Sequence, residues 1–334
     1  MQYTRSRTVV VPAMKKLVIV AIGGNSLIKD NAHQTVPDQY NAICETAKHI
    51  TDIAGQGYEV IVTHGNGPQV GFILRRSDIA AEVAQMHHVP LASCDADTQG
   101  AIGYQIQQAL DNEFKKRGLK ENGKLKSAVT IVTQVVVDRK DPAFKNPTKP
   151  IGSFYTETQV KEMTQSNPSW AFINDAGRGF RRVVASPKPV EIIEVDAIKS
   201  LIALGFCVIA VGGGGIPVFK SDDGTLKGVD AVIDKDFATS LLASNLNADV
   251  LIISTGVEKV CLNYGRPDQR TLDKITVSEA KKYIKEGHFA PGSMLPKIQA
   301  AIQFLEMGGK KAIITSPESL CKSMRGESGT HVVP

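Results

Sequence analysis

The sequence of 334 residues predicts an α/β fold, with an open and mainly parallel sheet that has helices on both faces. Short aliphatic runs bounded by glycine or turn residues recur along the chain, as is typical of strands buried on both faces of a parallel sheet. Segments with apolar residues at helical spacing separate these runs. The length allows one large domain or two lobes, and we expect two lobes on one continuous sheet.

The expected elements follow one another in strand and helix order. The expected strands are Leu17–Ile22, Glu59–Thr63, Ala128–Val137, Phe206–Val211, Val250–Ser254 and Ala312–Thr315. The expected helices are Ala42–Ala54, Gly103–Phe114, Val195–Leu204, Phe237–Leu246 and Ile298–Phe304.

Residues 138–190 interrupt this alternation. The stretch contains six prolines, three glycines and the basic cluster Arg178, Arg181 and Arg182. Loops of such length without structure of their own are uncommon in compact domains. We therefore expect an inserted subdomain that protrudes from the sheet and acts as a lid that excludes water.

Composition and charge exclude several classes of protein. Apolar residues make up 42% and charged residues 22% of the chain, which excludes a disordered tail or a fibre. The net charge of +5 comes without a dense basic run interleaved with aromatics, so no nucleic-acid partner is expected. The five cysteines lie far apart and form no C-x-x-C pair, which argues against zinc or redox chemistry and is typical of a reducing compartment.

The N-terminal residues predict no targeting segment. In Met1–Met14 the apolar run is limited to Val9–Val11, whereas a signal peptide needs a longer apolar core. No stretch of the sequence reaches the roughly 18 apolar residues that span a bilayer, so no membrane partner is expected. We expect a cytoplasmic protein with a flexible N-terminal extension over residues 1–14.

Three predicted strands end in glycine-rich corners, which are Gly23-Gly24-Asn25, Gly65-Asn66-Gly67 and Gly212-Gly213-Gly214-Gly215. Ligands bind at the carboxyl ends of parallel strands, where glycine lets backbone N–H groups approach an anion closely. Each corner by itself is equally well explained as a tight turn. Together they favour a phosphate-binding crevice. The sequence has no G-x-x-x-x-G-K-[ST] motif, and Gly65, Gly67 and Gly71 miss the dinucleotide spacing by one residue, which disfavours a dehydrogenase.

Two lysines occupy the first turns of predicted helices. Asp234 is a suitable N-cap for a helix that begins near Lys235, and Pro296 suits the first turn of a helix that contains Lys297. The helix dipole disfavours a cation there by about 0.3–1 kcal/mol, so both positions call for an anion. A phosphoryl group in transfer would supply it, with Asp236 holding the lysines or orienting Mg²⁺. The alternative is a surface salt bridge between Lys235 and a neighbouring aspartate.

A third lysine lies in the inserted segment. Pro147 and Pro150 stiffen the backbone around Lys149, as is wanted when a lid delivers one charge to one place. His64 precedes a glycine corner, where it is either a hydrogen-bond donor or a structural histidine, and the structural interpretation is favoured. Residues 175–182, with their arginines, are either a second anion site or a solvated cluster.

Several motifs together resemble those of carbamate kinases, which have the amino acid kinase fold, and the resemblance runs from Lys16 to Pro334. They are Gly23-Gly24-Asn25, His64–Gly71, Thr133–Asp138, Asn146–Gly152, Asp175–Arg182, Ser186–Pro189, Gly212–Val218, Ala231–Phe237 and Phe289–Lys297. The resemblance implies reversible phosphoryl transfer between ATP and carbamate, which gives ADP and carbamoyl phosphate. It also implies Mg²⁺ held mainly by the nucleotide phosphates with no metal site on the protein, a homodimer, and ATP formation at the end of an arginine deiminase pathway.

The resemblance also implies roles for individual residues. Residues 15–220 would form an N-terminal lobe that binds carbamate and dimerises, and residues 221–334 a C-terminal lobe that binds the nucleotide. Lys149, Lys235 and Lys297 would bind the phosphoryl group, with Asp236 organising them. The groups around carbamate and the phosphate would be Gly23, Gly24, Asn25, Gly65, Asn66, Gly213 and Gly214. The nucleotide side would be Lys235, Tyr264, Met294 and Lys297.

The sequence departs from the carbamate kinase pattern at a few positions. Asp95 and Asp97 are acidic where small or apolar residues are usual, and Asn174 stands where Glu is common. The first departure bears on the dimer surface or on the carbamate side. Two alternatives stay open: another acid kinase of the same fold, or a catalytically silent nucleotide sensor.

Overall fold

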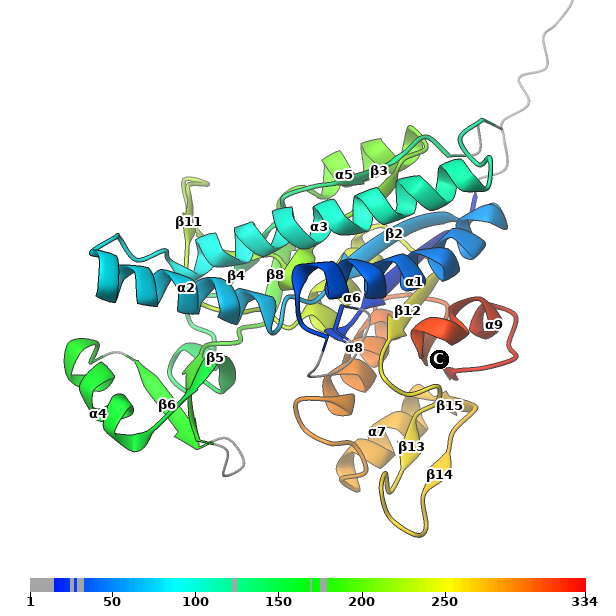
Figure 1. Cartoon of the computed structure of the whole chain (residues 1–334). Helices are drawn as coiled ribbons and strands as arrows, with labels where there is room; N and C mark the ends of the chain where they lie inside the picture. Colours follow the sequence, from blue (N-terminus) through cyan, green and yellow to red (C-terminus); the bar gives the residue numbers. More distant parts are fainter. Residues whose placement is uncertain (1–14, 25–26, 29–32, 122–124, 169, 175–178) are drawn as a thin grey trace, which may run out of the picture.

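A computed structural model describes residues 15–24, 27–28, 33–121, 125–168, 170–174 and 179–334. It confirms the α/β class (Figure 1). The central sheet has eight strands in the order β15-β17-β16-β12-β1-β2-β9-β3, all parallel to their neighbours except β16 with β17. Its strands are β1 (Leu17–Ile22), β2 (Glu59–His64), β3 (Ala128–Thr130), β9 (Cys207–Ile209), β12 (Val250–Ser254), β15 (Lys274–Thr276), β16 (Ala312–Thr315) and β17 (Thr330–Val333).

Strand β1 shows why the aliphatic runs are continuous. Successive side chains of a strand point to opposite faces, so a strand covered on both sides needs apolar residues at every position. Leu17, Ile19 and Ala21 pack into one core cluster, whereas Val18 and Val20 pack into another. Every residue of β1 is buried.

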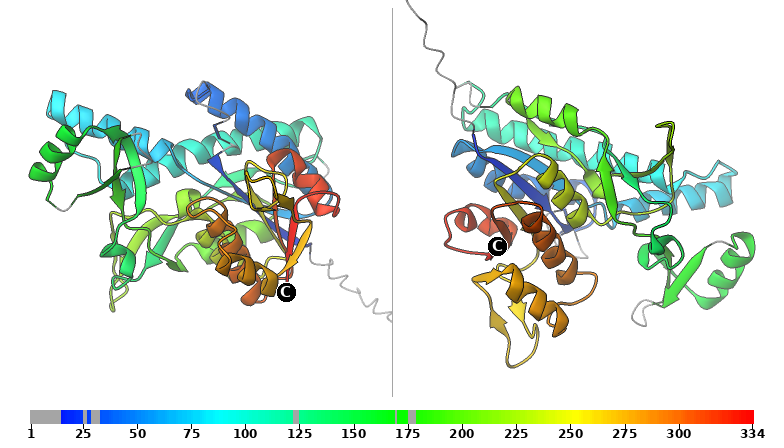
Figure 2. Two further views of the ribbon diagram at one scale, coloured as in Figure 1. Left: turned by 90° about the horizontal axis from the view of Figure 1, so that it is seen from below. Right: turned by 180° about the vertical axis from the view of Figure 1, so that it is seen from behind.

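Helices cover both faces of this sheet (Figure 2). Helices α1 (Val36–Gly55) and α3 (Leu91–Lys116) contribute Ile50 and Leu110 to the cluster that contains Val18, and helices α6 (Lys235–Asn245) and α8 (Met294–Glu306) pack on the opposite face. Further helices are α2 (Gln69–Ala84), α4 (Glu157–Ser166), α5 (Val195–Ala203), α7 (Val277–Lys285) and α9 (Leu320–Met324). Of these, α5 is the predicted helix Val195–Leu204, and the rest were not predicted.

The prediction of one strand over Ala128–Val137 is wrong. Strand β3 pairs with β9 in the central sheet, whereas β4 (Gln134–Val137) joins a second sheet in the order β11-β10-β4-β8. The side chain of Gln99 explains the break, because it accepts a hydrogen bond from Thr133 N at 2.8 Å and donates one to Thr133 O at 3.1 Å. Thr133 O also accepts a hydrogen bond from Ile216 N at 2.9 Å, whereas Ile131 N donates to Ile209 O, so the chain changes its pairing partner from β9 to β10 at this point. The other strands of this sheet are β8 (Pro189–Ile192), β10 (Ile216–Lys220) and β11 (Leu226–Gly228).

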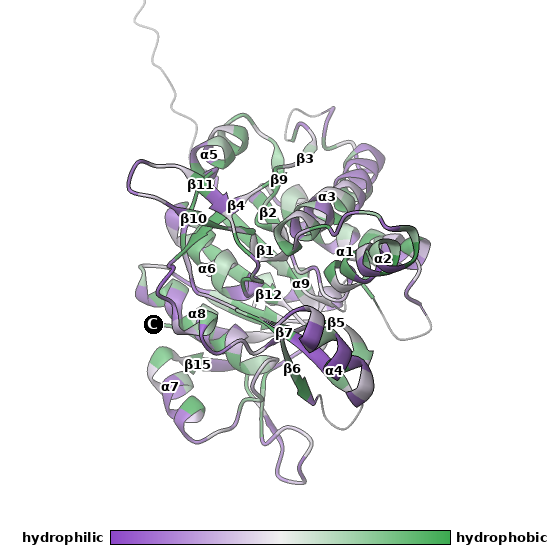
Figure 3. Cartoon of the chain, turned by 90° about the vertical axis from the view of Figure 1, so that its left-hand side faces the viewer, coloured by the Kyte–Doolittle hydropathy of each residue, from purple (hydrophilic) through white to green (hydrophobic). Residues whose placement is uncertain are grey.

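Part of the inserted segment forms a sheet of its own. Strands β5 (Lys149–Tyr155), β6 (Ala171–Asn174) and β7 (Phe180–Val184) are antiparallel in the order β5-β7-β6, and with α4 they protrude from the body of the molecule (Figure 1). Strand β5 packs closely on α2: a Cβ added to Gly71 would lie 2.9 Å from the backbone N of Gly152. The hydropathy colouring shows strongly hydrophilic residues on α4, in contrast to the central strands (Figure 3).

Short elements complete the described chain. They are the hairpin strands β13 (Cys261–Leu262) and β14 (Arg270–Thr271), and the 3-10 turns η2 (Pro142–Phe144), η3 (Gly212–Gly214) and η4 (Pro317–Ser319). Within the described ranges, none of the helices has the length and apolar character needed to cross a bilayer.

Candidate active site

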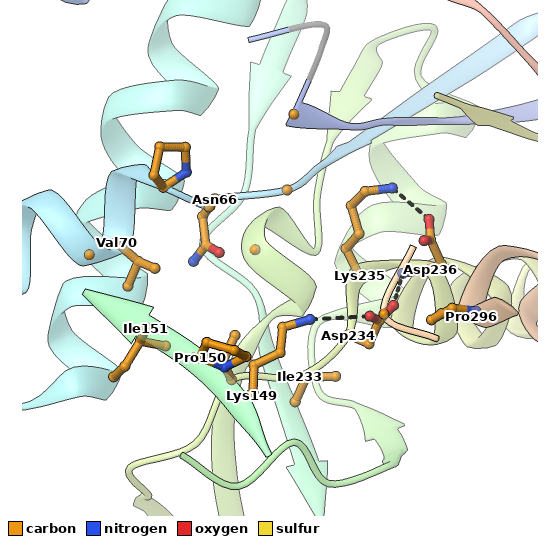
Figure 4. A pocket seen from close by; sticks show the side chains of 18 of the residues that line it. Asn66, Val70, Lys149, Pro150, Ile151, Ile233, Asp234, Lys235, Asp236 and Pro296 are labelled. Atoms are coloured by element: carbon orange, nitrogen blue, oxygen red, sulfur yellow. Dashed lines mark hydrogen bonds and ion pairs between the residues drawn. The ribbon is translucent and has the colours of Figure 1, made fainter. Parts of the chain in front are cut away.

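A pocket of about 320 Å³ lies at the carboxyl ends of β1 and β2 (Figure 4). Because β1 and β2 are parallel neighbours, the glycine corners that follow them meet at one edge of the sheet. The start of β5 and the N-termini of α6 and α8 close the other sides. The lining includes Gly24, Gly65, Asn66, Lys149, Arg181, Gly213, Asp234, Lys235, Asp236, Ser293, Pro296 and Lys297.

Lys235 and Lys297 lie in the first turns of α6 and α8, as the sequence predicts, and both bind Asp236. Lys235 Nζ donates to Asp236 Oδ1 at 2.5 Å, and Lys297 Nζ donates to Asp236 Oδ2 at 2.9 Å. The side chains are 12%, 14% and 3% exposed, respectively, so this cluster is buried and differs from an exposed surface salt bridge.

Burial and charge set the ionisation of this cluster. Desolvation lowers the pKa of the Lys235 ammonium, opposed by the charge of Asp236. Burial opposes ionisation of Asp236 too, yet the charges of Lys235 and Lys297 outweigh it and hold the pKa of Asp236 at about 2. The formal charges of the two lysines and one aspartate sum to +1 at this side of the pocket.

Asp234 connects this cluster to the inserted segment. It is the N-cap of α6, where its Oδ1 accepts from Asp236 N at 2.9 Å. Its Oδ2 accepts from Lys149 Nζ at 3.2 Å, which brings the charge of β5 to the same pocket (Figure 4). Sequence reasoning identified Asp234 only as a cap. The 85 positions between the two partners left no local signal for the contact.

The same bonds bear on Mg²⁺. Each carboxylate oxygen of Asp234 and Asp236 already accepts a hydrogen bond from the protein. Asp236 accepts hydrogen bonds from both lysines, which is the contact expected for the first of the two roles considered from the sequence. The described residues contain no group of three His, Cys, Asp or Glu side chains arranged as a metal site.

The glycines of the three corners lack a Cβ that would crowd the neighbouring side chains of Lys235 and Asn66. A Cβ added to Gly65 would lie 3.2 Å from Lys235 Cδ, and one added to Gly23 would lie 3.1 Å from Ser254 O and 3.9 Å from Lys235 Cε. The aliphatic stem of Lys235 therefore runs past both corners. At the third corner, a Cβ on Gly213 would lie 2.4 Å from Asn66 Nδ2. Close packing explains these glycines at least as well as anion binding.

His64 is fully buried beneath the pocket, consistent with the structural interpretation. Its Nδ1–H donates to Gly65 O at 2.8 Å, and its Nε2 lies buried without a hydrogen-bond partner among the described residues. Desolvation, aided by the charge of Lys235, lowers the pKa of His64 to about 4, although the hydrogen bond to Gly65 opposes the shift. The imidazole is therefore neutral near neutral pH.

Most predicted site residues converge on this pocket. Gly24, Gly65, Asn66, Lys149, Gly213, Lys235, Asp236 and Lys297 are in its lining. Arg181, which the sequence left open as part of a second anion site, also lines it. The structure places Gly23 beside the stem of Lys235, and it packs Gly214, whose φ is 98°, against Ile233 O.

The remaining predicted residues lie elsewhere. Tyr264 is 69% exposed and Met294 begins α8, and neither is in the pocket lining. Asn25, Arg178 and the predicted extension over residues 1–14 lie outside the described residues. Of the unusual acidic residues, Asp97 is exposed, whereas Asp95 is buried and accepts a hydrogen bond from Asn66 Nδ2 at 2.9 Å.

Comparisons with known proteins agree with this geometry. The model of the amino acid kinase family matches residues 16–316. The carbamate kinase-like protein YahI of Escherichia coli is 54% identical over 96% of this chain and 99% of its own length, and the carbamate kinase of Thermococcus kodakarensis is 48% identical over 95% and 99%. The structure of carbamate kinase from Giardia lamblia bound to AMP-PNP superposes with a TM-score of 0.88 at 45% identity, covering 96% of this chain and 98% of that one.

A more distant neighbour shares only the fold. The N-acetylglutamate synthase of Neisseria gonorrhoeae is 13% identical, with a TM-score of 0.57. The near-complete coverage at 45–54% identity, together with the lysine pocket, decides the assignment. The chain belongs to the amino acid kinase family, and within it to the carbamate kinases and their close relatives.

Proposed function

We propose that this enzyme transfers a phosphoryl group reversibly between ATP and carbamate, with ADP and carbamoyl phosphate as the products. The observation that carries the proposal is the convergence of Lys149, Lys235 and Lys297, from three separate elements, on one pocket at the glycine corners. Relatives named as carbamate kinases, one of them bound to the ATP analogue AMP-PNP, support the choice of substrates.

The reaction requires that carbamate and ATP are positioned and that the negative charge of the transferring phosphoryl group is neutralised. An anionic carbamate oxygen attacks the γ-phosphorus and forms the new O–P bond, while the bond to the bridging β-phosphate oxygen breaks and leaves its electron pair on ADP. The nucleophile is already ionised, so no general base is required. The lysine ammonium groups offset the charge on the equatorial phosphoryl oxygens, which is the main source of catalysis in such transfers. Mg²⁺, when bound to the nucleotide, adds to this neutralisation.

The resemblance to carbamate kinases supports the following roles for the two lobes. Residues 15–220 supply the glycine corners and hold carbamate, and residues 221–334 supply α6 and α8 and hold the nucleotide, with Tyr264 and Met294 on the adenine side. The inserted segment delivers Lys149 as a lid. By the resemblance, Gly24, Asn25 and Gly65 match the residues around the transferring group. A homodimer, a cytoplasmic location and ATP synthesis at the end of arginine deiminase catabolism belong to the proposal as implications of the resemblance.

The test is formation of ATP from ADP and carbamoyl phosphate, read by a coupled hexokinase assay. We expect turnover that requires Mg²⁺. A panel of acceptors with ATP runs beside it, including glutamate analogues and nucleoside monophosphates. Phosphorylation of one of these without any turnover of carbamoyl phosphate would show another acid kinase, and nucleotide binding without any turnover would show a silent sensor.

A further inference from the structure

The side-chain amide of Asn66 donates both of its N–H groups to residues of α3. Asn66 Nδ2 donates to Asp95 Oδ1 at 2.9 Å and to Thr98 Oγ1 at 3.2 Å. Asn66 is only 5% exposed, and it lies among the residues that line the pocket (Figure 4). None of the described residues donates to its Oδ1. The polar atom that this side chain has left for a ligand is therefore an acceptor, not a donor.

Thr98 fixes which way the amide faces. Its hydroxyl donates to the carbonyl oxygen of Asp95 at 2.6 Å, so Thr98 Oγ1 has no proton left to give and can only accept. The atom of Asn66 that faces it must then be the nitrogen. Both partners lie one turn apart on the buried side of α3, and neither can move without the helix.

Asp95 is an unusual residue for this place. It is 2% exposed, and its Oδ2 has no hydrogen-bond partner among the described residues. Burial raises the pKa of the Asp95 carboxyl well above its ordinary value, although the bond from Asn66 opposes this. A proton on Oδ2 leaves Oδ1 an acceptor, so Asn66 is held in the same orientation whether Asp95 is ionised or neutral. A buried carboxyl oxygen without a hydrogen-bond partner destabilises the folded protein. Orienting the Asn66 side chain is a functional reason for an aspartate at this position.

We propose that Asp95, with Thr98, is a positioning residue that turns the carbonyl oxygen of Asn66 into the pocket, where it accepts a hydrogen bond from the amino group of the substrate. The inference rests on the proposed function, and it assigns the recognition of the amino group to one atom. Carbamate and carbamoyl phosphate carry an N–H₂ group, whereas acetyl phosphate has a methyl group of similar size at that position. An acceptor aimed at this group favours the amino compound, because the methyl group leaves the buried oxygen unpaired.

The experiment compares carbamoyl phosphate with acetyl phosphate as phosphoryl donors to ADP. The readout is the ratio of their kcat/KM values. We expect Asp95→Leu to lower this ratio at least tenfold, mainly through a higher KM for carbamoyl phosphate, because the 3.2 Å bond to Thr98 is then the one contact left among the described residues to hold the Asn66 N–H₂ group against α3. Asp95→Asn keeps a carbonyl oxygen for Asn66 and should retain the wild-type ratio. Asp97→Leu, the same substitution on the exposed side of α3, is the control.

The outcomes separate the possibilities. A ratio in Asp95→Leu within twofold of wild type, or an equal loss with both donors, overturns the inference and leaves the proposed function standing. Wild-type enzyme that forms no ATP from carbamoyl phosphate overturns both. If Asp95→Leu does not fold, Thr98→Val decides, since it removes the second acceptor and should also lower the ratio, while an unchanged ratio contradicts the inference.

Discussion

Lys235 and Lys297 reach the same carboxylate from the first turns of two different helices. The first binds Asp236 Oδ1 at 2.5 Å and the second binds Asp236 Oδ2 at 2.9 Å, so one aspartate keeps two like charges at the floor of the pocket. Helix N-termini ordinarily disfavour cations, and burial disfavours them further. The two lysines create a positive electrostatic potential in the pocket, which the negative oxygens of an incoming phosphoryl group neutralise.

We predict that Lys297→Ala lowers the rate of ATP formation from carbamoyl phosphate by about 10²–10³-fold, because the variant removes a charge that acts on the transferring group. The melting temperature should change much less, since Asp236 keeps its bond to Lys235. The control is Lys259→Ala, which removes an ion pair with Asp273 that lies outside the pocket lining. Near-normal turnover in Lys297→Ala would refute the assigned role.

The second prediction concerns the inserted segment. Lys149→Ala should lower turnover by about 10²-fold, because the lid then lacks the charge that it delivers to the pocket. Stability should fall by less than about 1 kcal/mol, since the ion pair with Asp234 is partly exposed. The matched control is Lys161→Ala on α4 of the same segment, which breaks an exposed pair with Glu157. Equal turnover in the two variants would show that Lys149 has no part in the reaction.

The third prediction tests the path of the Lys235 stem. In Gly65→Ala the new methyl group would lie 3.2 Å from Lys235 Cδ, so the stem must shift by a few tenths of an ångström. We expect about a tenfold loss of kcat with the protein still folded, because small displacements of a charged group cost catalysis steeply. Gly100→Ala is the control, since a Cβ there meets no atom within 4 Å. Activity of Gly65→Ala at the wild-type level would mean that Lys235 has more room than the structure gives it.

The fourth prediction concerns acid stability. The pKa of His64 falls from 6.5 to about 4 on folding, so the unfolded chain takes up a proton in a pH range where the folded protein does not. The free energy of unfolding should therefore be highest above about pH 6.5 and fall by roughly 3 kcal/mol as the pH drops to about 4. Urea unfolding across this range measures the effect.

A pair of variants isolates the contribution of His64. The fall in stability should be smaller in His64→Gln, which has no group to titrate, than in wild type. His87→Gln, at an exposed histidine, should behave as wild type. A similar acid limb in His64→Gln would assign the effect to groups other than His64. Asp236 is not among them, because its pKa of about 2 places its own loss of stability at lower pH.

Local patterns predicted the regular elements well where one environment covers a whole segment. The run Leu17–Ile22 became β1 unchanged, because continuous apolar residues suit a strand buried on both faces. The first-turn positions of Lys235 and Lys297 were also readable, since caps and proline act within a few residues. The prediction of one strand over Ala128–Val137 was wrong because a contact distant in sequence determines the structure there. Gln99, more than thirty positions away, supplies the bonds that divide it.

By itself, then, the sequence determined the fold class, the glycine corners and the residue types that handle a phosphoryl group, all of which depend on interactions between near neighbours. Only the tertiary structure decided how those groups meet: that Asp236 binds two lysines, that Asp234 at the start of α6 accepts a bond from Lys149 of β5, and that Asn66 turns its nitrogen toward α3. Each of these contacts joins segments whose separation along the chain carries no pattern. Their geometry follows from how the sheets and helices pack, because packing alone determines which polar atoms are buried together and must satisfy one another.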